Sequence, residues 1–311
     1  MSPKILVSDP LSSNALAVLR AAPGLVVEER VGLGEGALLP LVSDTDAWIV
    51  RGATKVTRRL LEAAPKLRWV ARAGAGVDNI DVDTARARGV SVLNVPGANA
   101  VAVAELVFGL LLALLRQIPA ADAALRRGEW EKSRWKGREL RGKRLGIVGM
   151  GRIGRAVARR AQGFEMTCLG HDPLVPDADI RALGVEPVAL EALLGSSDIV
   201  TLHVPLTAGT QGMIGGAALH RMPRGAILVN AARGGLVDEA AVLRALETGA
   251  LAGAAFDVFA QEPPGASPLL DRPDVVATPH VGAATVEAQE AVGEEIVKLL
   301  LGAMREAGAL T

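Results

Sequence analysis

Short apolar runs alternate with amphipathic segments along the chain, and this alternation predicts its architecture. In the first third, β-type runs are separated by stretches in which apolar residues recur with helical spacing. Continuous apolar strands followed by helices are typical of a parallel sheet that is covered on both faces. The expected strands are 5–7, 25–27, 47–50, 69–71 and 90–93, and the expected helices are 11–21, 35–43, 57–64 and 82–88.

The same alternation returns after residue 144 and predicts a second sheet. A last helix is expected at about 285–306, and its apolar face predicts packing against the first domain. The expected strands are 145–148, 166–169, 198–202, 226–230, 252–255 and 275–277, and the expected helices are 102–115, 152–162, 190–194, 215–221 and 238–247.

These patterns predict an α/β fold with two Rossmann-like or flavodoxin-like parallel-sheet domains joined by a hinge. The 311 residues exceed the usual size of one core. Pro96 and Gly97 interrupt the pattern, and Asn99 stands as a helix N-cap before the apolar helix. The expected domains are therefore 99–284 and a discontinuous one made of 1–98 plus about 285–311.

A glycine pattern marks the start of the second sheet. The expected strand at 145–148 runs directly into Gly149-x-Gly151-x-x-Gly154, a helix follows, and the next strand ends at Asp172. In this setting Gly149 makes the tight turn, Gly151 lets a pyrophosphate approach the backbone, and Gly154 allows close helix–strand packing. The helix N-terminus favours the phosphates, and Asp172 would accept hydrogen bonds from the ribose. The expected cofactor is NAD rather than NADP.

Composition narrows the classes of partner. Lys plus Arg equals Asp plus Glu, so the formal net charge is zero and neither a nucleic acid nor an anionic membrane is an expected partner. The apolar run near 106–115 is too short to span a bilayer. No signal peptide precedes the first strand, so a cytoplasmic protein is expected. The single cysteine, Cys168, lies in an expected strand and is interpreted as a core thiol.

Polar residues follow several of the expected strands. Parallel sheets bind ligands at the carboxyl ends of their strands, so these side chains should converge on one crevice. The residues at the strand ends are His203, Arg233, Asp257, Glu262 and His280. No cluster has metal-ligand spacing, and no metal is expected.

Three of these residues suit hydride transfer at a carbon that bears oxygen. His280 can give or take the proton, Glu262 can orient the imidazole, and Arg233 can clamp a substrate carboxylate. Each residue also has a plain structural interpretation: a loop-capping arginine, a solvated turn acid or a satisfied turn histidine. Their coincidence beside a dinucleotide motif favours chemistry. His203 is expected to line the cofactor site, and the lack of tyrosine removes a tyrosine proton donor.

The chain resembles the D-isomer-specific 2-hydroxyacid dehydrogenases over nearly its whole length. Within that family the resemblance is closest to the 3-phosphoglycerate dehydrogenases, in a short form without a C-terminal regulatory domain. It rests on the glycine pattern and on six further segments: 50–57, 72–81, 203–207, 230–238, 257–263 and 279–282.

The resemblance implies an NAD-dependent enzyme whose catalytic set falls on Arg233, Glu262 and His280. It also implies a hinge that closes between a substrate-binding domain and an NAD-binding domain, and a homodimer formed through the latter. The implied cofactor contacts are Gly149, Gly151, Arg152, Ile153, Gly154, Asp172, His203, Pro205, Thr210, Ala231, Ala232, Asp257 and Gly282. The implied substrate contacts are Arg51, Gly74, Ala75, Gly76, Val77, Asn99 and Lys132, with Arg51 and Lys132 as the phosphate-binding cations.

Some positions depart from the family pattern. Hydroxyl residues often stand where Ala75 and Ala102 are found here, and a tyrosine commonly replaces His171. Without the regulatory domain, feedback by serine is not expected. Arg51 and Lys132 could also be plain surface charges, and the charged stretch 126–141 is read equally well as a solvated loop or as a dimer contact anchored by Trp130 and Trp135.

The sequence thus predicts an NAD-dependent oxidoreductase that interconverts a D-2-hydroxy acid and its 2-keto acid. The favoured pair is 3-phosphoglycerate and 3-phosphohydroxypyruvate, as in serine biosynthesis. The alternatives are a glyoxylate/hydroxypyruvate reductase and a non-enzymatic NAD-sensing protein similar to a corepressor.

Overall fold

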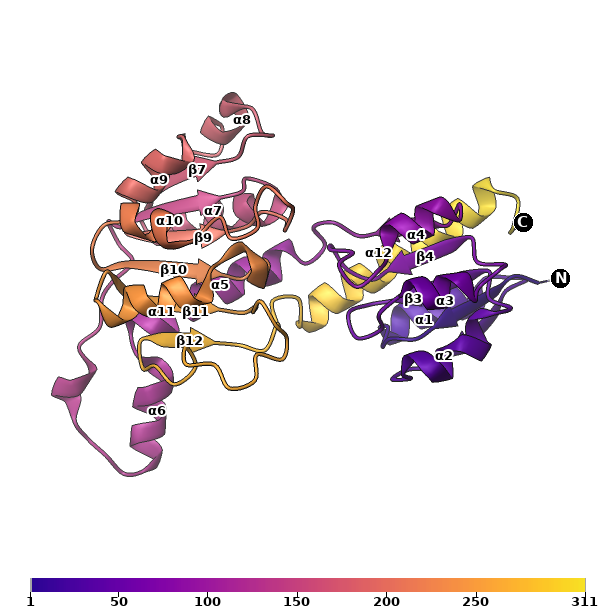
Figure 1. Cartoon of the computed structure of the whole chain (residues 1–311), viewed down its shortest axis with the longest axis horizontal. Helices are drawn as coiled ribbons and strands as arrows, with labels where there is room; N and C mark the ends of the chain where they lie inside the picture. The colour runs from indigo at the N-terminus through magenta and orange to yellow at the C-terminus, as the bar shows by residue number, and fades with distance from the viewer. Residues whose placement is uncertain (1, 311) are drawn as a thin grey trace. The chain divides into compact units, whose positions relative to one another are not determined.

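The computed structural model describes residues 2–310 and divides the chain into two compact units (Figure 1). The first unit runs through Asn99 and takes in the chain again from Ala284, and the second comprises Ala100–Ala283. Each unit is built on one parallel sheet, so the predicted α/β fold with two parallel-sheet domains is confirmed.

The first unit contains a five-stranded sheet in the order β2-β1-β3-β4-β5. All of its pairings are parallel, and β3 is the middle strand, between β1 and β4. The strands are β1 (Lys4–Val7), β2 (Val26–Glu29), β3 (Ala47–Val50), β4 (Trp69–Arg72) and β5 (Ser91–Asn94), and the helices are α1 (Ser13–Ala21), α2 (Glu35–Val42), α3 (Arg58–Glu62), α4 (Val82–Ala87) and α12 (Val286–Glu306).

The helices of the first unit cover both faces of this sheet. One apolar cluster joins α1 and α12 to the sheet, and a second joins α2, α3 and α4 to its other face. Because each strand is covered on both sides, β3 is buried along its whole length, which is why it reads as an uninterrupted apolar run.

The second unit contains a seven-stranded parallel sheet in the order β12-β11-β10-β9-β6-β7-β8. The order reverses between β6 and β9, which are direct neighbours. The strands are β6 (Arg144–Val148), β7 (Thr167–His171), β8 (Glu186–Pro187), β9 (Ile199–Leu202), β10 (Ala226–Asn230), β11 (Leu251–Phe256) and β12 (Val275–Ala277), and the helices are α5 (Ala100–Leu115), α6 (Ile118–Arg126), α7 (Arg152–Gly163), α8 (Asp177–Arg181), α9 (Leu190–Ser196), α10 (Gly216–Arg221) and α11 (Glu239–Glu247).

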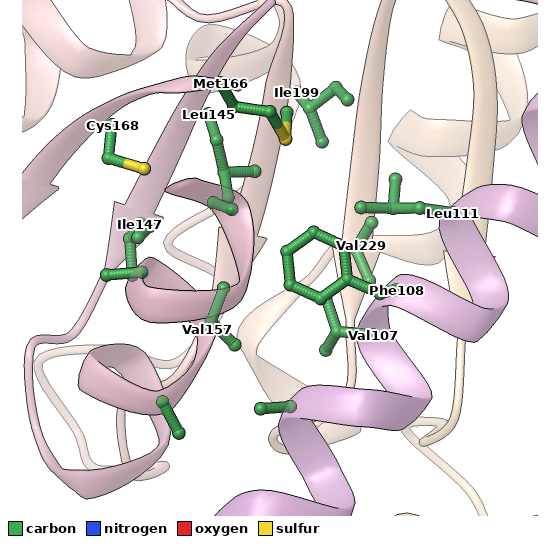
Figure 2. Close-up of a cluster of buried hydrophobic side chains, with 14 of the residues drawn as sticks. Val107, Phe108, Leu111, Leu145, Ile147, Val157, Met166, Cys168, Ile199 and Val229 are labelled. Atoms are coloured by element: carbon green, nitrogen blue, oxygen red, sulfur yellow. The ribbon is translucent and has the colours of Figure 1, made fainter. Parts of the chain in front are cut away.

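Apolar clusters cover both faces of this second sheet. On one face α5 and α7 pack against it, and Val107, Phe108 and Leu111 of α5 point toward Val229 on the sheet (Figure 2). On the other face α9, α10 and α11 form a second cluster. Cys168 is 3% exposed within the first layer, and burial raises the pKa of its thiol to about 11, as expected for a core thiol.

Polar side chains fix where several helices begin. At each of five helix starts a Ser, Thr or Asp side chain accepts the N–H three residues further on, which satisfies one of the free donors of the first turn. These N-caps are Ser12, Thr57, Asp81, Asp238 and Thr285.

The elements that the sequence pattern did not predict are short. They are α6, α8, β8 and the 3₁₀ turns Lys132–Trp135 and Gly234–Leu236. Helix α6 directly follows α5 after Gln117, whose φ of 51° is left-handed, and it carries a proline in its first turn. Within the stretch 126–141, Lys132–Trp135 forms a 3₁₀ turn, and most residues of the stretch are exposed.

Residues 2–310 contain no single helix that is long and apolar enough to cross a membrane. Helices α5 and α6 meet that measure of length and composition only when taken together, and they are bent by 60° where they join.

Candidate functional site

The turn between β6 and α7 has the tight packing that its glycines predict. Gly149 has a φ of 99°, and a Cβ there would lie 2.6 Å from the carbonyl carbon and oxygen of His203. A Cβ on Gly154 would overlap the carbonyl oxygen of Gly149. Side chains at either position would therefore force β6, β9 and α7 apart at the point where the strand order reverses.

Gly151 differs from these two glycines because nothing in the protein lies within 4 Å of the Cβ it lacks. It is the N-cap of α7 and makes no side-chain cap hydrogen bond. The first-turn N–H groups of α7, which include those of Arg152 and Ile153, lie at the positive end of the helix dipole. The open space at this helix start fits the pyrophosphate of a dinucleotide.

Asp172 follows the neighbouring strand β7, and the backbone fixes its carboxylate. One oxygen accepts the Met150 N–H at 2.8 Å, and the other accepts the Leu174 N–H at 2.9 Å. Each carboxylate oxygen has a second lone pair, so both can still accept a hydroxyl. Asp172 is thus held beside the glycine turn and fits the role of ribose acceptor.

His203 directly follows β9, and its backbone carbonyl packs against Gly149 of that turn. Thr201 Oγ1 lies 3.0 Å from its Nε2, whereas Nδ1 is buried and has no hydrogen-bond partner among residues 2–310. Burial lowers the pKa of this imidazole from 6.5 to about 3. His203 is therefore neutral in the folded state, and a buried polar atom beside the cofactor turn is consistent with the predicted contact.

This lowered pKa has a consequence for stability in acid. The unfolded chain binds a proton at His203 near pH 6.5, but the folded chain resists that proton until about pH 3, so the contribution is complete above pH 6.5 and is lost as the pH falls. Between pH 6.5 and 5 the free energy of unfolding should drop by up to about 2 kcal/mol through this group. Urea unfolding of wild type and His203→Asn at both pH values checks this, and an equal loss in the two proteins contradicts it.

The loop after His203 is organised by one threonine. Thr210 Oγ1 donates to the Pro205 carbonyl at 2.7 Å and accepts the Thr207 N–H at 2.8 Å. These bonds fix the loop that carries the predicted cofactor contacts Pro205 and Thr210.

The end of β10 presents Arg233. The Asn230 side chain donates to the Arg233 carbonyl at 2.9 Å and accepts the Ala232 N–H at 3.1 Å, which fixes the backbone between Asn230 and Arg233. Arg233 Nη1 also donates to the Ala232 carbonyl at 2.7 Å. Ala231 is buried, and Ala232 is half-buried.

His280 and Glu262 form a hydrogen-bonded pair at the neighbouring strand ends. His280 Nδ1 lies 2.8 Å from Glu262 Oε2, and Glu262 Oε1 accepts the Phe259 N–H at 3.1 Å. An ionised carboxylate only accepts, so Nδ1 carries the hydrogen and Nε2 is the nitrogen that can exchange a proton with a ligand. The His280 side chain is 52% exposed and can therefore reach one.

The segment that follows Arg233 packs tightly against the segment that leads to Glu262. Gly234 lies so close to the backbone of Phe259 and Ala260 that a Cβ would overlap it. Glu239, in the first turn of α11, accepts the Ala260 N–H at 2.6 Å. No signal in the sequence pointed to Glu239, since a first-turn acid is ordinary in any helix.

Asp257 and Gly282, both predicted as cofactor contacts, are bonded to each other. Asp257 is 1% exposed at the end of β11, and its carboxylate accepts from Thr278 Oγ1 at 2.6 Å and from the N–H groups of Val281 and Gly282, each at 2.8 Å. The turn 278–282, which carries His280, is thus fastened to the end of β11.

The first unit places Arg51 at its own point of strand reversal, between β1 and β3. Buried Asp9 accepts the Arg51 N–H at 2.6 Å. A small pocket lies there, lined by Pro10, Leu11, Ser12, Arg51, Ala73, Gln289 and Val292. A pocket at a strand reversal, lined by a cation, fits an anionic ligand.

The predicted carboxylate-binding backbone follows β4 in the same unit. Ala75 and Gly74 use their carbonyl groups within the fold, accepting from Asn94 Nδ2 at 2.5 Å and from the Val95 N–H at 2.9 Å. Arg72, which the sequence did not single out, donates from Nε to the Arg51 carbonyl at 2.9 Å. Asn99 has a buried Oδ1 without a hydrogen-bond partner in the described chain.

Lys132 belongs to the second unit and lies on the segment after α6. Its Nζ is 5.7 Å from the centre of the Trp130 ring, and both residues are exposed. Figure 1 shows α6 and this segment extending away from the seven-stranded sheet. Within residues 2–310, no group of three or more His, Cys, Asp or Glu side chains could hold a metal ion.

Comparison with known proteins gives this geometry a context. Residues 108–282 match the family model of the D-isomer specific 2-hydroxyacid dehydrogenase NAD binding domain. The chain is 47% identical to D-3-phosphoglycerate dehydrogenase of Methanocaldococcus jannaschii and 45% identical to that of Rattus norvegicus, over 97% and 94% of its own length. It spans only 58% and 55% of the length of those two proteins.

Solved structures are also similar to this chain over nearly its whole length. The TT0316 protein of Thermus thermophilus is 38% identical, with a TM-score of 0.89 and 97% of each chain covered. A glyoxylate reductase from Paecilomyes thermophila is 32% identical, with a TM-score of 0.89 over all of this chain and 97% of the other. The chain therefore belongs to the D-isomer specific 2-hydroxyacid dehydrogenase family and contains the NAD-binding domain of that family.

Proposed function

We propose that the protein is an NAD-dependent dehydrogenase that interconverts a D-2-hydroxy acid and its 2-keto acid, with 3-phosphoglycerate and 3-phosphohydroxypyruvate as the favoured pair. The observation that carries the proposal is the His280–Glu262 pair, held 2.8 Å apart at strand ends of the sheet that also carries the dinucleotide turn. The relatives named D-3-phosphoglycerate dehydrogenase support the choice of substrate.

Each member of the catalytic set has a distinct role in this proposal. When bound, NAD supplies or accepts the hydride. His280 gives its Nε2 proton to the oxygen of the 2-keto group as the alcohol forms, and Glu262 holds the imidazole in the required tautomer through Nδ1. Arg233 binds the substrate carboxylate and polarises the neighbouring carbonyl.

The residues around the glycine turn would hold the cofactor. Gly151 and the first turn of α7 receive the pyrophosphate, Asp172 receives the ribose, and the His203 carbonyl packs against the turn. The remaining proposed contacts are Gly149, Arg152, Ile153, Gly154, Pro205, Thr210, Ala231, Ala232, Asp257 and Gly282.

The first unit would bind the substrate. The backbone of Gly74, Ala75, Gly76 and Val77 is proposed to hold the carboxylate, and Asn99 is a further proposed substrate contact. Arg51, at the pocket beside Ala73, is proposed to bind the phosphate. Lys132 would complete the phosphate site from a second copy of the chain.

A glyoxylate/hydroxypyruvate reductase is the second candidate, because the glyoxylate reductase structure matches the whole chain. The experiment that separates the two is a steady-state assay with NADH and three keto acids: phosphohydroxypyruvate, hydroxypyruvate and glyoxylate. A kcat/KM at least about tenfold higher for the phosphorylated acid supports the first function, and the reverse order supports the second. Tight NADH binding without reduction of any of the three refutes both.

Arg51→Ala combined with Lys132→Ala should separate phosphate binding from chemistry. Loss of two charge-assisted contacts should raise the KM for phosphohydroxypyruvate by about 30-fold or more, while the KM for glyoxylate changes less than about threefold. Lys55→Ala is the control, since it removes an exposed cation from the same loop as Arg51. An equal rise in KM for both substrates would show that these cations do not recognise a phosphate.

We also propose a homodimer formed through α6 and the segment behind it. Ile118 and Leu125 are seven residues apart on one face of α6 and are 51% and 54% exposed, and Trp130 is 73% exposed. Exposed aromatic and aliphatic side chains gathered in this way are typical of an interface. Trp130→Asp should shift the molar mass from light scattering toward 32.2 kDa, the mass of one chain. Leu174→Asp, which alters another exposed apolar residue, should not; a monomeric wild type removes the proposal.

A further inference from the structure

Arg51 begins a loop after β3, and hydrogen bonds hold its backbone on both sides. The Arg51 N–H donates to Asp9 Oδ2 at 2.6 Å. The Arg51 carbonyl accepts from Arg72 Nε at 2.9 Å and from Asn79 Nδ2 at 3.2 Å. The Asn79 amide also donates to the Thr54 carbonyl at 2.7 Å. The loop 51–54, which carries this cation, is therefore fixed from within the first unit.

Asp9 holds the loop at two points with a carboxylate that is 3% exposed. Besides the Arg51 N–H, it accepts the Thr54 N–H, which lies 3.0 Å from Oδ1 and 3.1 Å from Oδ2. Oδ1 also accepts the Thr54 hydroxyl at 2.7 Å. Because water does not compete for these donors, bonds from a buried carboxylate restrain the loop strongly.

A chain of hydroxyl groups leads from the core of the sheet to this carboxylate. The Trp48 indole can only donate, and its Nε1–H donates to Ser8 Oγ at 2.8 Å. Ser8 Oγ lies 3.0 Å from Thr54 Oγ1. Since the Thr54 hydroxyl donates to Asp9, the Ser8 hydroxyl is the donor in its pair with Thr54. Trp48, Ser8 and Thr54 are each at most 5% exposed, so a buried polar chain connects the loop to the middle strand β3.

The same carboxylate joins two parts of the wall of the small pocket beside Arg51. Residues 10–12 directly follow Asp9 in the sequence and line this pocket, and Arg51 lines it as well. Burying a charge is costly, and an apolar contact often stabilises a fold equally well. The geometry that Asp9 imposes explains its presence better, because it fixes the start of the Arg51 side chain relative to residues 10–12.

We propose that Asp9 is a positioning residue for Arg51, fixing the loop 51–54 so that the guanidinium meets the phosphate group of a phosphorylated keto acid. This inference rests on the proposed role of Arg51 in phosphate binding. Because Asp9 is buried and its oxygens face donors of the loop, it acts through Arg51 and not by contact with the anion.

Asp9→Asn tests the proposal, because the amide keeps the size of the side chain but replaces an acceptor by a donor that faces donors of the loop. The KM for phosphohydroxypyruvate should rise about tenfold, while kcat and the KM for glyoxylate each change less than about twofold. An equal rise in KM for the two substrates, or an unchanged KM for both, would overturn the proposal.

Thr54 variants keep the test available if Asp9→Asn does not fold. Thr54→Val removes the hydroxyl that donates to Asp9 but keeps the backbone N–H, so the KM for phosphohydroxypyruvate should rise about threefold. Thr54→Ser keeps the hydroxyl and should have the KM of wild type. If Thr54→Val and Thr54→Ser raise this KM equally, the hydroxyl does not act through Asp9 and the proposal fails.

A combination with Arg51→Ala shows whether Asp9 acts through that residue. Adding Asp9→Asn to Arg51→Ala should change the KM for phosphohydroxypyruvate less than about twofold, because no guanidinium is left to misplace. A purely structural effect of Asp9 would instead add to that of Arg51→Ala. A further rise of about tenfold in the double variant would therefore refute the positioning role.

Asp46→Asn is the matched control. Asp46 Oδ2 also accepts a backbone N–H, from Lys4 at 2.8 Å. Asp46 directly precedes β3, whereas Arg51 directly follows it, so the two carboxylates form their bonds at opposite ends of the same strand. Asp46→Asn should lower the melting temperature and keep the wild-type KM for both substrates. A KM for phosphohydroxypyruvate raised as much as in Asp9→Asn would show a general effect on the sheet and contradict the proposal.

A measurement without turnover separates this inference from the proposed function. Selective ¹⁵N-arginine labelling reports the Arg51 N–H, and Arg51→Lys identifies its signal. This amide should exchange its hydrogen with water at least about tenfold faster in Asp9→Asn, because its acceptor is impaired. An unchanged exchange rate would overturn the positioning role, whichever substrate the enzyme prefers. Faster exchange in a protein that does not prefer phosphohydroxypyruvate to glyoxylate would support the hold of Asp9 on Arg51 and refute the proposed substrate.

Discussion

His280→Ala is expected to lower kcat for keto-acid reduction by about 10³-fold while the dissociation constant for NADH stays within about twofold of wild type. The reason is the pairing of His280 Nδ1 with Glu262, which leaves Nε2 as the atom that delivers the proton. Without it, water must protonate the forming alkoxide. Because the histidine is exposed at a turn and not part of a core, the fold should survive the change.

His220→Ala is the control for this experiment, since His220 is an exposed histidine on α10 of the same unit. It should leave kcat unchanged. Glu262→Gln should give an intermediate loss, because an amide still contacts the ring but stabilises its protonated form less. A wild-type kcat in His280→Ala would exclude His280 as the proton donor, even if the dissociation constant for NADH changed.

The fold could be predicted because its strands are covered on both sides. Runs such as 47–50 and 226–230 are buried throughout, and burial of that kind leaves a clear apolar signal. Helix α6 and the strand β8 were not predicted. Helix α6 follows α5 almost directly, after a left-handed Gln117, and the apolar pattern does not show that break. Strand β8 has only two residues and a single neighbour, β7, which is too short for a periodic pattern.

The residues of the candidate site could be predicted where they directly follow a strand in the sequence. Arg233, Glu262 and His280 each follow a strand, and the structure brings Glu262 and His280 into contact. The supporting bonds were not predictable in the same way. Asp257 bonds to a turn more than twenty residues further along the chain, and Glu239 to a loop on another element, and such pairings leave no local pattern. The sequence showed the residues that can react but not the ones that hold them.

Gly151→Ala is expected to weaken NADH binding by about 30-fold or more, equal to roughly 2 kcal/mol, while the free energy of unfolding changes by less than about 1 kcal/mol. The added methyl meets nothing within 4 Å in the protein, and the φ of −68° and ψ of −162° suit alanine. Its only cost to the fold is a poorer N-cap. The space it fills is the one through which a pyrophosphate would approach the start of α7.

Two other glycines make this prediction specific. Gly163, at the end of α7, also has nothing within 4 Å, so Gly163→Ala should stabilise the protein by up to about 1 kcal/mol and leave NADH binding unchanged. Gly149→Ala should instead destabilise it by about 2–3 kcal/mol, since its φ of 99° and the nearby His203 carbonyl exclude a side chain. If Gly151→Ala binds NADH like wild type in isothermal titration calorimetry, the open helix start does not hold the pyrophosphate. If Gly151→Ala weakens NADH binding without changing the free energy of unfolding, Gly151 serves cofactor binding, whereas Gly149 is required for the fold.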